Sequence, residues 1–472
     1  MKFSFVSPSP SADTPGMVTS AWPPLGVLYI AGILMREGIE VSILDQVIKN
    51  VSIDQSIRWV KKENPDIVGF SVCGCSAREA FKLAGIVKKE MPDTTVVLGN
   101  YHATFNAERI LKKYSSIDII VRGEGEYTSL DLVKCLEKRH HLKEVDGITF
   151  RNNEEIVSTP DRPLIKNIDK LPFPDRSLMN AEYTSLIYGV RVATKKFTTV
   201  VSSRGCPFQC TFCGCRKFAR GVWRPRSVDN IIDELEYLKS EGYEQFLFVD
   251  DNFTLNTKRV VNLCQRMRKE KLNMEWWCDS RVDHVSYDMF QEMVKAGCRI
   301  LYFGIESANQ RILDYYKKGT TPEQSRSAVN KARKAGMDVI VGSFIVGAPD
   351  ETRREIQTTL KFAHELNIDV PQLNVLWSEP GTDIWKEVVS KGWVNEEKMW
   401  ETGAYVANIS PRAVPFQEIR SMIYDYFKAF GLRPGLLAKE ILRTCKSAYR
   451  LKGLVHNVAR LDEIFENLQK VP

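Results

Sequence analysis

The chain has 472 residues, of which 43% are hydrophobic and 26% are charged. This balance is ordinary for a globular protein, and the length predicts roughly two to four domains. The net charge of +7 is small for the length, so no nucleic-acid partner is expected. No run approaches the ~18 apolar residues of a membrane span, and the short apolar start is not a signal peptide, so we expect a cytoplasmic protein.

Strands and helices alternate through residues 1–140. Strands are expected at 2–6, 41–44, 67–72, 95–98 and 117–121, and helices at 25–36, 53–62, 77–90, 107–113 and 128–139. This α/β alternation predicts a Rossmann-like, doubly wound parallel sheet, in which ligands bind outside the carboxyl ends of the strands. No GxGxxG motif follows the first strand, which argues against a dinucleotide ligand.

Residues 141–196 are expected to form a connector, with a β-hairpin around Asn152-Asn153 and an extended proline-rich segment at 171–176. Between residues 197 and 385 the alternation resumes, with six strands expected at 197–201, 245–249, 275–278, 299–305, 339–346 and 372–376. Six strands are too few for a closed eight-stranded barrel. They predict a partial (β/α)6 barrel whose carboxyl-end loops share one mouth.

Residues 386–472 are expected to form a helical and basic region. An amphipathic helix is predicted at 416–430, and a second helix at 436–455 carries five Lys or Arg residues. One interpretation is a C-terminal helical cap with a solvated face. The alternative is contact of this region with a membrane surface or an acidic substrate.

Cys206, Cys210 and Cys213 lie in the loop after the strand at 197–201, with CxxxCxxC spacing. A 4Fe-4S cluster is usually held by four thiolates. Three ligands in one loop, with no evident fourth, would leave one iron open to bind a small molecule and pass it an electron. A structural zinc site that includes Cys215 is the alternative. Zinc knuckles usually combine two CxxC or CxH units, however, and only Cys210 and Cys213 have CxxC spacing here. The role of Cys215 stays open.

The CxxxCxxC loop, with Phe212 before its last cysteine, resembles that of the radical S-adenosylmethionine (SAM) enzymes. The resemblance implies that Cys206, Cys210 and Cys213 bind a 4Fe-4S cluster, whose open iron binds SAM and cleaves it to a 5′-deoxyadenosyl radical. Carried over by position, the strand ends imply these contacts to SAM: Phe212, Ile345 and Gly347 at adenine; Asp250, Asp251 or Asn252 at the amino group; Arg281 at the carboxylate; Glu306 and Ser307 at the ribose or methionyl part.

A second resemblance covers the first 140 residues. The segments 22–31, 99–103 and 123–126 resemble the cobalamin-binding domain of class B radical SAM enzymes. The DxHxxG motif that supplies a histidine ligand to cobalt elsewhere is absent, so the lower cobalt ligand stays open. The resemblance implies cobalamin contacts from residues at these strand ends: Pro24, Leu25, Gly26, Ser71, Gly99, Asn100, His102, Gly123, Glu124 and Glu126. For His102, an ordinary loop histidine is the alternative.

Together the two resemblances imply a cobalamin-dependent radical SAM enzyme that takes hydrogen from an unactivated carbon and methylates it from methylcobalamin. A cyclase or C–C bond-forming enzyme without methyl transfer is the first alternative. A tRNA methylthiotransferase, which would need a second cluster at Cys73 and Cys75, and a non-enzymatic corrin or iron–sulfur protein are the others. A reductant such as flavodoxin or ferredoxin is the implied partner, and the aromatic content permits a lipid or tetrapyrrole substrate.

Overall fold

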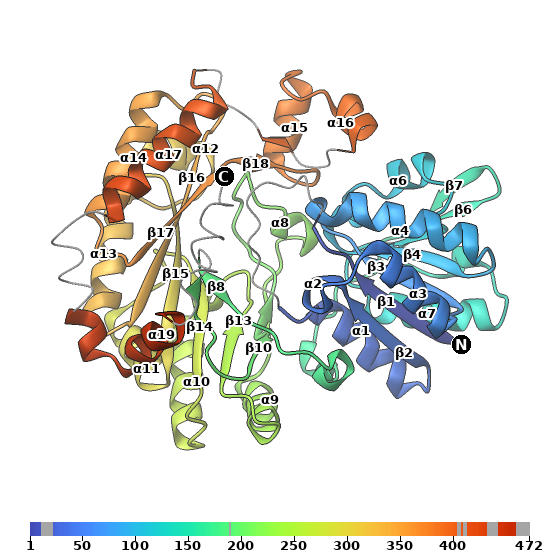
Figure 1. Cartoon of the computed structure of the whole chain (residues 1–472), viewed down its shortest axis with the longest axis horizontal. Coiled ribbons are helices and arrows are strands. Elements are labelled where there is room, and N and C mark those ends of the chain that lie inside the picture. The colour runs from blue at the N-terminus through green and yellow to red at the C-terminus, as the bar shows by residue number, and fades with distance from the viewer. Residues whose placement is uncertain (11–21, 188–189, 404–406, 409–412, 432–441, 459–472) are drawn as a thin grey trace.

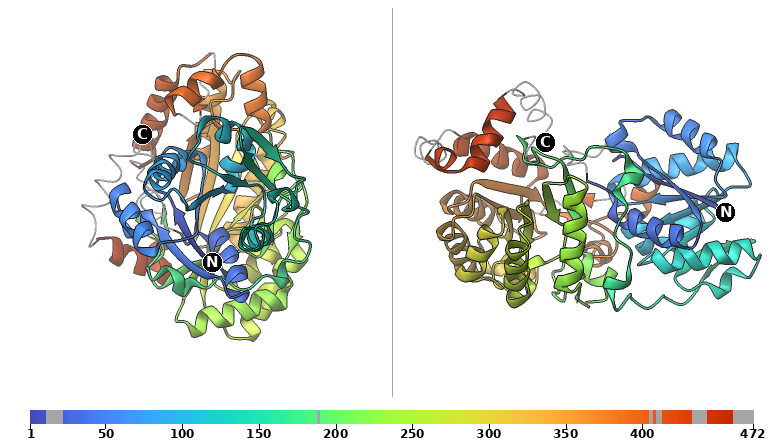
Figure 2. Two further views of the ribbon diagram at one scale, coloured as in Figure 1. Left: turned by 90° about the vertical axis from the view of Figure 1, so that its right-hand side faces the viewer. Right: turned by 90° about the horizontal axis from the view of Figure 1, so that it is seen from below.

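The computed structural model describes residues 1–10, 22–187, 190–403, 407–408, 413–431 and 442–458. Two β-sheets, each packed with helices, form two domains that lie side by side (Figure 1). Figure 2 shows the same two domains from the side and from below, with the C-terminal helices on the barrel domain. None of the described helices combines the length and the hydropathy needed to cross a bilayer.

The N-terminal domain contains a seven-stranded sheet in the order β2-β1-β3-β4-β5-β6-β7. The first five strands are parallel, and the β6–β7 hairpin continues the sheet in antiparallel fashion. The strands are β1 (Lys2–Ser7), β2 (Glu40–Asp45), β3 (Ile67–Ser71), β4 (Thr95–Gly99), β5 (Ile119–Val121), β6 (Ile148–Asn152) and β7 (Glu155–Ser158). The hairpin predicted in the connector therefore belongs to this sheet, because it pairs with the otherwise open edge of β5.

Helices cover both faces of this sheet. Helices α1 (Leu25–Arg36) and α7 (Glu126–Glu137) pack on one face, and α3 (Ile53–Glu63), α4 (Ala77–Glu90) and α6 (Ala107–Lys113) pack on the other. The start of α3 is set locally by a capping box, in which the Ser52 and Gln55 side chains satisfy each other's backbone N–H groups. The predicted Rossmann-like sheet is confirmed.

The second domain contains six parallel strands in chain order, with β10 and β17 at the two edges. The barrel is therefore open, as its six predicted strands require. The strands are β10 (Phe197–Val200), β13 (Gln245–Phe248), β14 (Glu275–Ser280), β15 (Cys298–Glu306), β16 (Val339–Val346) and β17 (Val370–Val375). The helices outside them include α9 (Val228–Ser240), α10 (Thr257–Lys269), α11 (Tyr287–Lys295), α13 (Pro322–Lys334) and α14 (Arg353–Glu365).

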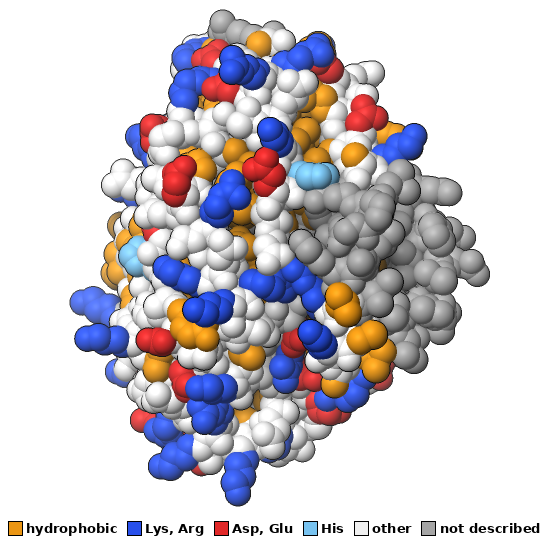
Figure 3. Space-filling view, turned by 90° about the vertical axis from the view of Figure 1, so that its left-hand side faces the viewer, with side chains coloured by type: hydrophobic (Ala, Val, Ile, Leu, Met, Phe, Trp, Pro, Cys, Tyr) orange, Lys and Arg blue, Asp and Glu red, His pale blue; other side chains and the backbone are white. Residues whose placement is uncertain are grey.

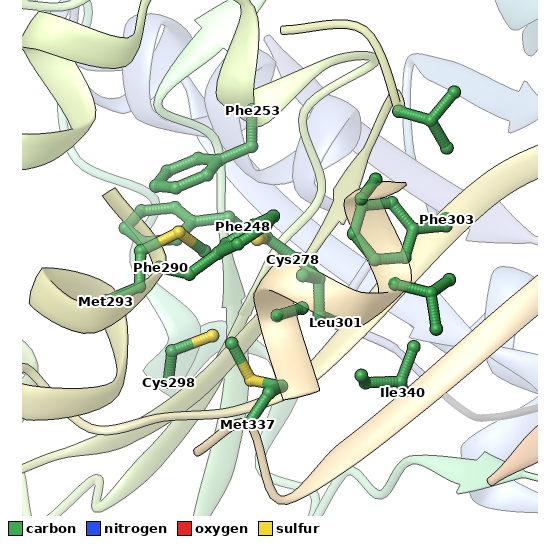
Figure 4. Close-up of a cluster of buried hydrophobic side chains, with 14 of the residues drawn as sticks. Phe248, Phe253, Cys278, Phe290, Met293, Cys298, Leu301, Phe303, Met337 and Ile340 are labelled. Carbon is green, nitrogen blue, oxygen red and sulfur yellow. The ribbon is translucent and has the colours of Figure 1, made fainter. Parts of the chain in front are cut away.

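Alternation along the strands divides the barrel's side chains into two sets. Phe248, Cys278, Leu301 and Phe303 belong to the core between strands and outer helices (Figure 4). Trp277 belongs to the opposite, inner face, where it stacks on Phe197 of β10 with ring centroids 5.1 Å apart. The inner face thus has an apolar floor beneath the carboxyl ends of the strands.

The C-terminal region connects the domains and packs on the barrel domain. Helices α15 (Asp383–Ser390) and α16 (Glu396–Thr402) cross to the N-terminal domain, and α17 (Phe416–Gly431) packs on α14. Helix α19 (Ala448–Val458) lies at the opposite end of the barrel from the cysteine loop. The predicted helix at 436–455 is confirmed only from residue 442, with a break at Ser447, because residues 432–441 lie outside the described residues.

Four of the five basic residues predicted in this region are described, and two of these four are ion-paired within the chain. Arg443 and Arg450 both contact the carboxylate of Asp369, which precedes β17. On the barrel side of the molecule, Lys and Arg side chains alternate with Asp and Glu rather than forming one continuous patch (Figure 3). These contacts support the interpretation of a packed cap.

Candidate active site

The cysteine loop lies at the carboxyl end of β10, between β11 (Ser203–Arg204) and α8 (Cys215–Phe218). Cys206, Cys210 and Cys213 are free and half-buried. Gly205, directly before them, has φ +85°, and a Cβ there would lie 2.3 Å from the carbonyl oxygen of Val222. The loop therefore begins with a backbone contact that only glycine permits.

Three thiols in one loop are the donor set that a 4Fe-4S cluster takes. Within the described residues, no three His, Cys, Asp or Glu side chains surround a point closely enough for a single metal ion. A cluster separates its thiolate ligands, because each of them binds a different iron. The residues present fit the predicted cluster.

Positive charges lie beside the cysteine loop. Nη1 of Arg281 is 3.8 Å from Sγ of Cys210, and its guanidinium covers the ring of Phe208 at 3.7 Å. Burial raises the pKa of the Cys210 thiol, and the charges of Lys318 and Arg281 act against that rise. Both cations have carboxylate partners of their own: Asp283 at 2.8 Å from Arg281 and Glu306 at 2.7 Å from Lys318. They favour thiolate ligands without leaving unpaired charge.

Cys215 is buried at the start of α8. Its thiol is hydrogen-bonded to Cys213, which raises the pKa of Cys215, with burial and the bond to Asp251 acting in the same direction. The same bond lowers the pKa of Cys213. Cys215 is thus a protonated neighbour that supports a thiolate at Cys213.

The three consecutive residues predicted at the SAM amino group have different surroundings. Asp250 is buried, and its carboxylate accepts three hydrogen bonds of 2.6 Å from Ser202 and Ser203. Asp251 is exposed, although its Oδ2 accepts a hydrogen bond from the backbone N–H of Gly205 at 2.9 Å, and Asn252 is buried with neither polar side-chain atom partnered among the described residues. Because the carboxylate of Asp250 is already occupied, we expect Asp251 and Asn252 to face the ligand instead.

The remaining predicted SAM contacts also lie at strand ends of the same mouth. Glu306 follows a bulge in β15, has φ +67° and is paired with Lys318. The hydroxyl of Ser307 is hydrogen-bonded to Thr359 inside the protein, so this residue supports the strand end. Phe212 and Ile345 pack in one small apolar cluster with the buried Tyr316.

Glu351 shapes the turn after β16, and sequence reasoning missed it. Its Oε2 accepts hydrogen bonds from the backbone N–H of Gly347 at 2.6 Å and Ala348 at 3.1 Å. Within the described part of the chain its Oε1 is buried without a partner, and burial raises the pKa of Glu351 to about 7. Lys318 was missed as well, because nothing in its local sequence indicates that it reaches Glu306.

A cavity of about 450 Å³ lies between the two domains. Glycines form part of its wall: a Cβ on Gly69 would lie 2.8 Å from the ring of Phe3, and one on Gly125 would lie 2.8 Å from Ile30. Nine of the ten residues predicted to contact cobalamin line this cavity: Pro24, Leu25, Gly26, Ser71, Gly99, Asn100, Gly123, Glu124 and Glu126. Glycine-lined walls allow a large flat ligand to approach the backbone, so the cavity fits a corrin.

His102 is the one predicted cobalamin contact that the cavity lining does not include. It does not line the cavity; it is buried on the other side of α5 (Asn100–Phe105), with Phe81 and Trp400 as ring neighbours. Burial lowers the pKa of His102 to about 4, so the imidazole is neutral at pH 7. His102 is a core residue.

We predict that replacing His102 by Gln leaves the visible spectrum of bound cobalamin unchanged, because the imidazole is separated from the cavity. The cost is expected in stability, at about 1–2 kcal/mol. Asn100→Ala is the matched control, since Asn100 does line the cavity. Absorption spectra of both variants check this, and a spectral change confined to the His102 variant would contradict it.

A largely buried ion network joins the domains in the wall of the cavity. Arg204 of the barrel domain contacts Glu124 at 2.9 Å and Glu126 at 2.6 Å, and Arg224 contacts Glu124 at 2.8 Å. Burial alone would raise the pKa of Glu124, but the bonds and charges of Arg224 and Arg204 outweigh it and hold that pKa below its ordinary value. The two glutamates thus bind the other domain as well as lining the cavity.

Tyr101 connects the cavity with the cysteine loop. Its ring stacks on Phe218 of α8 at 4.6 Å, and a Cβ on Gly214 would lie 2.7 Å from it. Cys215 and Asp251, which belong to the barrel domain, also line the cavity. One short stretch of chain therefore separates the cluster ligands from the cavity.

Family models match both domains. The model described as the radical SAM superfamily covers residues 200–363, and that of the B12 binding domain covers residues 16–133. An uncharacterised methyltransferase of Pyrococcus horikoshii is 35% identical over 93% of this chain and 95% of its own length. The chain therefore belongs to the radical SAM enzymes that carry a cobalamin-binding domain. Its cofactors are a 4Fe-4S cluster, SAM and cobalamin.

Other relatives differ in what they are named for. An anaerobic magnesium-protoporphyrin IX monomethyl ester cyclase of Rubrivivax gelatinosus is 32% identical over 89% of this chain and 76% of its own length. Among solved structures, the radical SAM methyltransferase TsrM from Kitasatospora setae matches with a TM-score of 0.67 and 18% identity, over 83% of this chain and 78% of its own. The cobalamin-dependent radical SAM enzyme OxsB matches with a TM-score of 0.66 and 21% identity, over 87% of this chain; this chain spans 57% of OxsB. These structures share the fold.

Proposed function

We propose that this enzyme methylates an unactivated carbon of a small-molecule substrate. The observation that carries the proposal is the shared wall between the cavity and the cysteine loop, which Cys215 and Asp251 form. When bound, the cluster and SAM supply a 5′-deoxyadenosyl radical, and cobalamin supplies the methyl group. Radical transfer and methyl transfer need reacting atoms within van der Waals reach, and a thin wall between the two sites meets that demand.

The chain's own residues position and enclose these groups. Arg281 and Lys318 hold positive charge beside Cys210, which favours a bound anionic cluster. Tyr101 packs against the cysteine loop with an aromatic face and excludes water between the sites. Arg204 holds the domains together, so that the two sites keep their separation.

Cyclisation or C–C bond formation without methyl transfer is the second candidate, and the 32% identical cyclase supports it. The more similar relative is named as a methyltransferase, which favours methylation. The family assignment removes the non-enzymatic alternative. A tRNA methylthiotransferase would need a second cluster at Cys73 and Cys75, for which the relatives named above give no support.

The finer partners are proposals as well. A flavodoxin or ferredoxin would supply electrons, and a tetrapyrrole substrate would follow from the relationship to the cyclases. Contact of the C-terminal region with a membrane surface would use Lys446 and Lys452, which are exposed, because Arg443 and Arg450 are paired with Asp369.

The methyl-transfer step can be tested without a known substrate. We expect the reduced, reconstituted enzyme to form S-adenosylhomocysteine from SAM only when cobalamin is present, alongside 5′-deoxyadenosine. Mass spectrometry of both products, with and without cobalamin, measures this. Formation of 5′-deoxyadenosine with no cobalamin-dependent S-adenosylhomocysteine would favour the cyclase alternative instead.

A further inference from the structure

Among the described residues, the carboxylate of Asp279, on the inner face of the barrel, has no partner. Asp279 of β14 is exposed, although both of its chain neighbours, Cys278 and Ser280, are buried. Cys278 faces the outer helices (Figure 4), so the alternation of the strand places Asp279 on the inner face with Trp277. Among the described residues, the Asp279 side chain makes no hydrogen bond or ion pair.

The position of Asp279 is set between the floor and the mouth of the barrel. Trp277, two residues earlier, is fully buried against Phe197 in the apolar floor. Arg281, two residues later, lies beside Cys210 of the cysteine loop. Two residues of strand span roughly 6.6 Å. Asp279 therefore lies two residues closer to the floor than Arg281, which contacts the cysteine loop.

The inner face offers more polar groups at this level. Tyr302 of β15 is the register partner of Asp279, and within the described chain its hydroxyl is without a hydrogen bond as well. The charge of Tyr449 from α19 acts on Tyr302, and the Tyr449 hydroxyl donates to the carbonyl oxygen of Val192. The C-terminal helix thus lies near the lower end of the inner face.

Burial raises the pKa of Asp279 to about 7, with the charges of Asp250 and Asp251 acting in the same direction. The carboxylate is exposed and, among the described residues, meets no hydrogen-bond donor, so it is free to accept one from a molecule bound on this face.

We propose that Asp279 determines substrate specificity by accepting a hydrogen bond from a hydroxyl or protonated amine of the substrate, which holds the reacting carbon below the SAM site. The inference rests on the proposed function. It selects a compact, largely apolar substrate with one donor group. A carboxylate end would be repelled by Asp279 and its acidic neighbours Asp250 and Asp251, so this inference favours such a compact substrate over the tetrapyrrole considered above, which carries propionate groups.

Three probes with one skeleton test the inference: cyclohexylmethylamine, cyclohexylmethanol and cyclohexanecarboxylate. Anaerobic equilibrium dialysis against the reconstituted enzyme with SAM and cobalamin measures their binding. We expect the amine to bind at least about tenfold more tightly than the carboxylate, because a charge-assisted hydrogen bond replaces a repulsion. Asp279→Asn should remove this preference and keep alcohol binding, and Asp279→Lys should reverse it. Asp288→Asn, on the outer surface, is the matched control.

Three outcomes would overturn the inference: equal binding of all probes to the wild-type enzyme, an unchanged preference in Asp279→Asn, or a loss of SAM binding by Asp279→Asn in the same dialysis. The last result would make Asp279 a SAM contact. Failure of the proposed function would be visible separately, as wild-type enzyme that forms no cobalamin-dependent S-adenosylhomocysteine.

Discussion

Replacement of Cys206, Cys210 and Cys213 by Ala is expected to abolish reductive SAM cleavage while cobalamin stays bound. The three thiols are the donor set for the cluster, and without them SAM has no electron source. The cavity for cobalamin is lined by other residues, so its occupancy does not depend on these thiols. Product analysis for 5′-deoxyadenosine, iron content and the corrin spectrum of the same sample measure the three parts of this result.

The matched control is Cys445→Ala, because Cys445 is exposed on the C-terminal segment. It should retain iron, SAM cleavage and corrin. SAM cleavage that persists in the triple variant would contradict the assignment of the cluster loop. Corrin loss together with iron would instead mean that the loop also shapes the cavity.

Replacement of Arg204 by Met is expected to lower the free energy of unfolding by roughly 3 kcal/mol, because it leaves Glu126 buried without its cation. It should also weaken cobalamin binding, since the network spans the domain boundary at the cavity. Anaerobic urea unfolding and corrin retention after gel filtration measure both. The double variant with Glu126→Gln should recover part of the loss, because it removes the stranded charge.

Arg220→Met is the matched control for this network. Arg220 is 44% exposed and is 3.5 Å from Asp161, so the expected loss is at most about 1 kcal/mol.

Because the folded-state pKa of Glu124 is lowered, its ion pairs stabilise the fold above the ordinary value of 4.5 and lose their effect as pH falls through the folded value. The stability difference between wild type and Glu124→Gln should therefore shrink below about pH 4.5. A difference that does not change with pH would contradict the network.

Local sequence was sufficient where chemistry depends on residues close in the chain. The CxxxCxxC spacing places three thiols in one loop whatever the surrounding fold. The strand ends that line the cavity could also be predicted, because parallel strands bring their carboxyl ends to one edge. Ser71, Gly99 and Gly123 come from three different strand ends and meet there for that reason.

Side-chain direction at those ends could not be predicted. Tyr101 and His102 are neighbours on α5, but successive helical residues point about 100° apart. Tyr101 therefore reaches the cysteine loop, while His102 enters the core against Trp400. In the same way, Asp250 turns into the protein to meet Ser202, and Asp251 next to it stays exposed.

By itself the amino-acid sequence determined the class of chemistry: a thiol loop at the first barrel strand, a second sheet for cobalamin, and the order of both along the chain. Only the tertiary structure decided the partners of Arg204 and Lys318 and the exposure of Asp279. Each of these depends on the packing of segments far apart in sequence, which no local pattern encodes. Glu126 meets Arg204 across 78 residues because the two domains dock, and Asp279 is exposed on the inner face with no partner among the described residues.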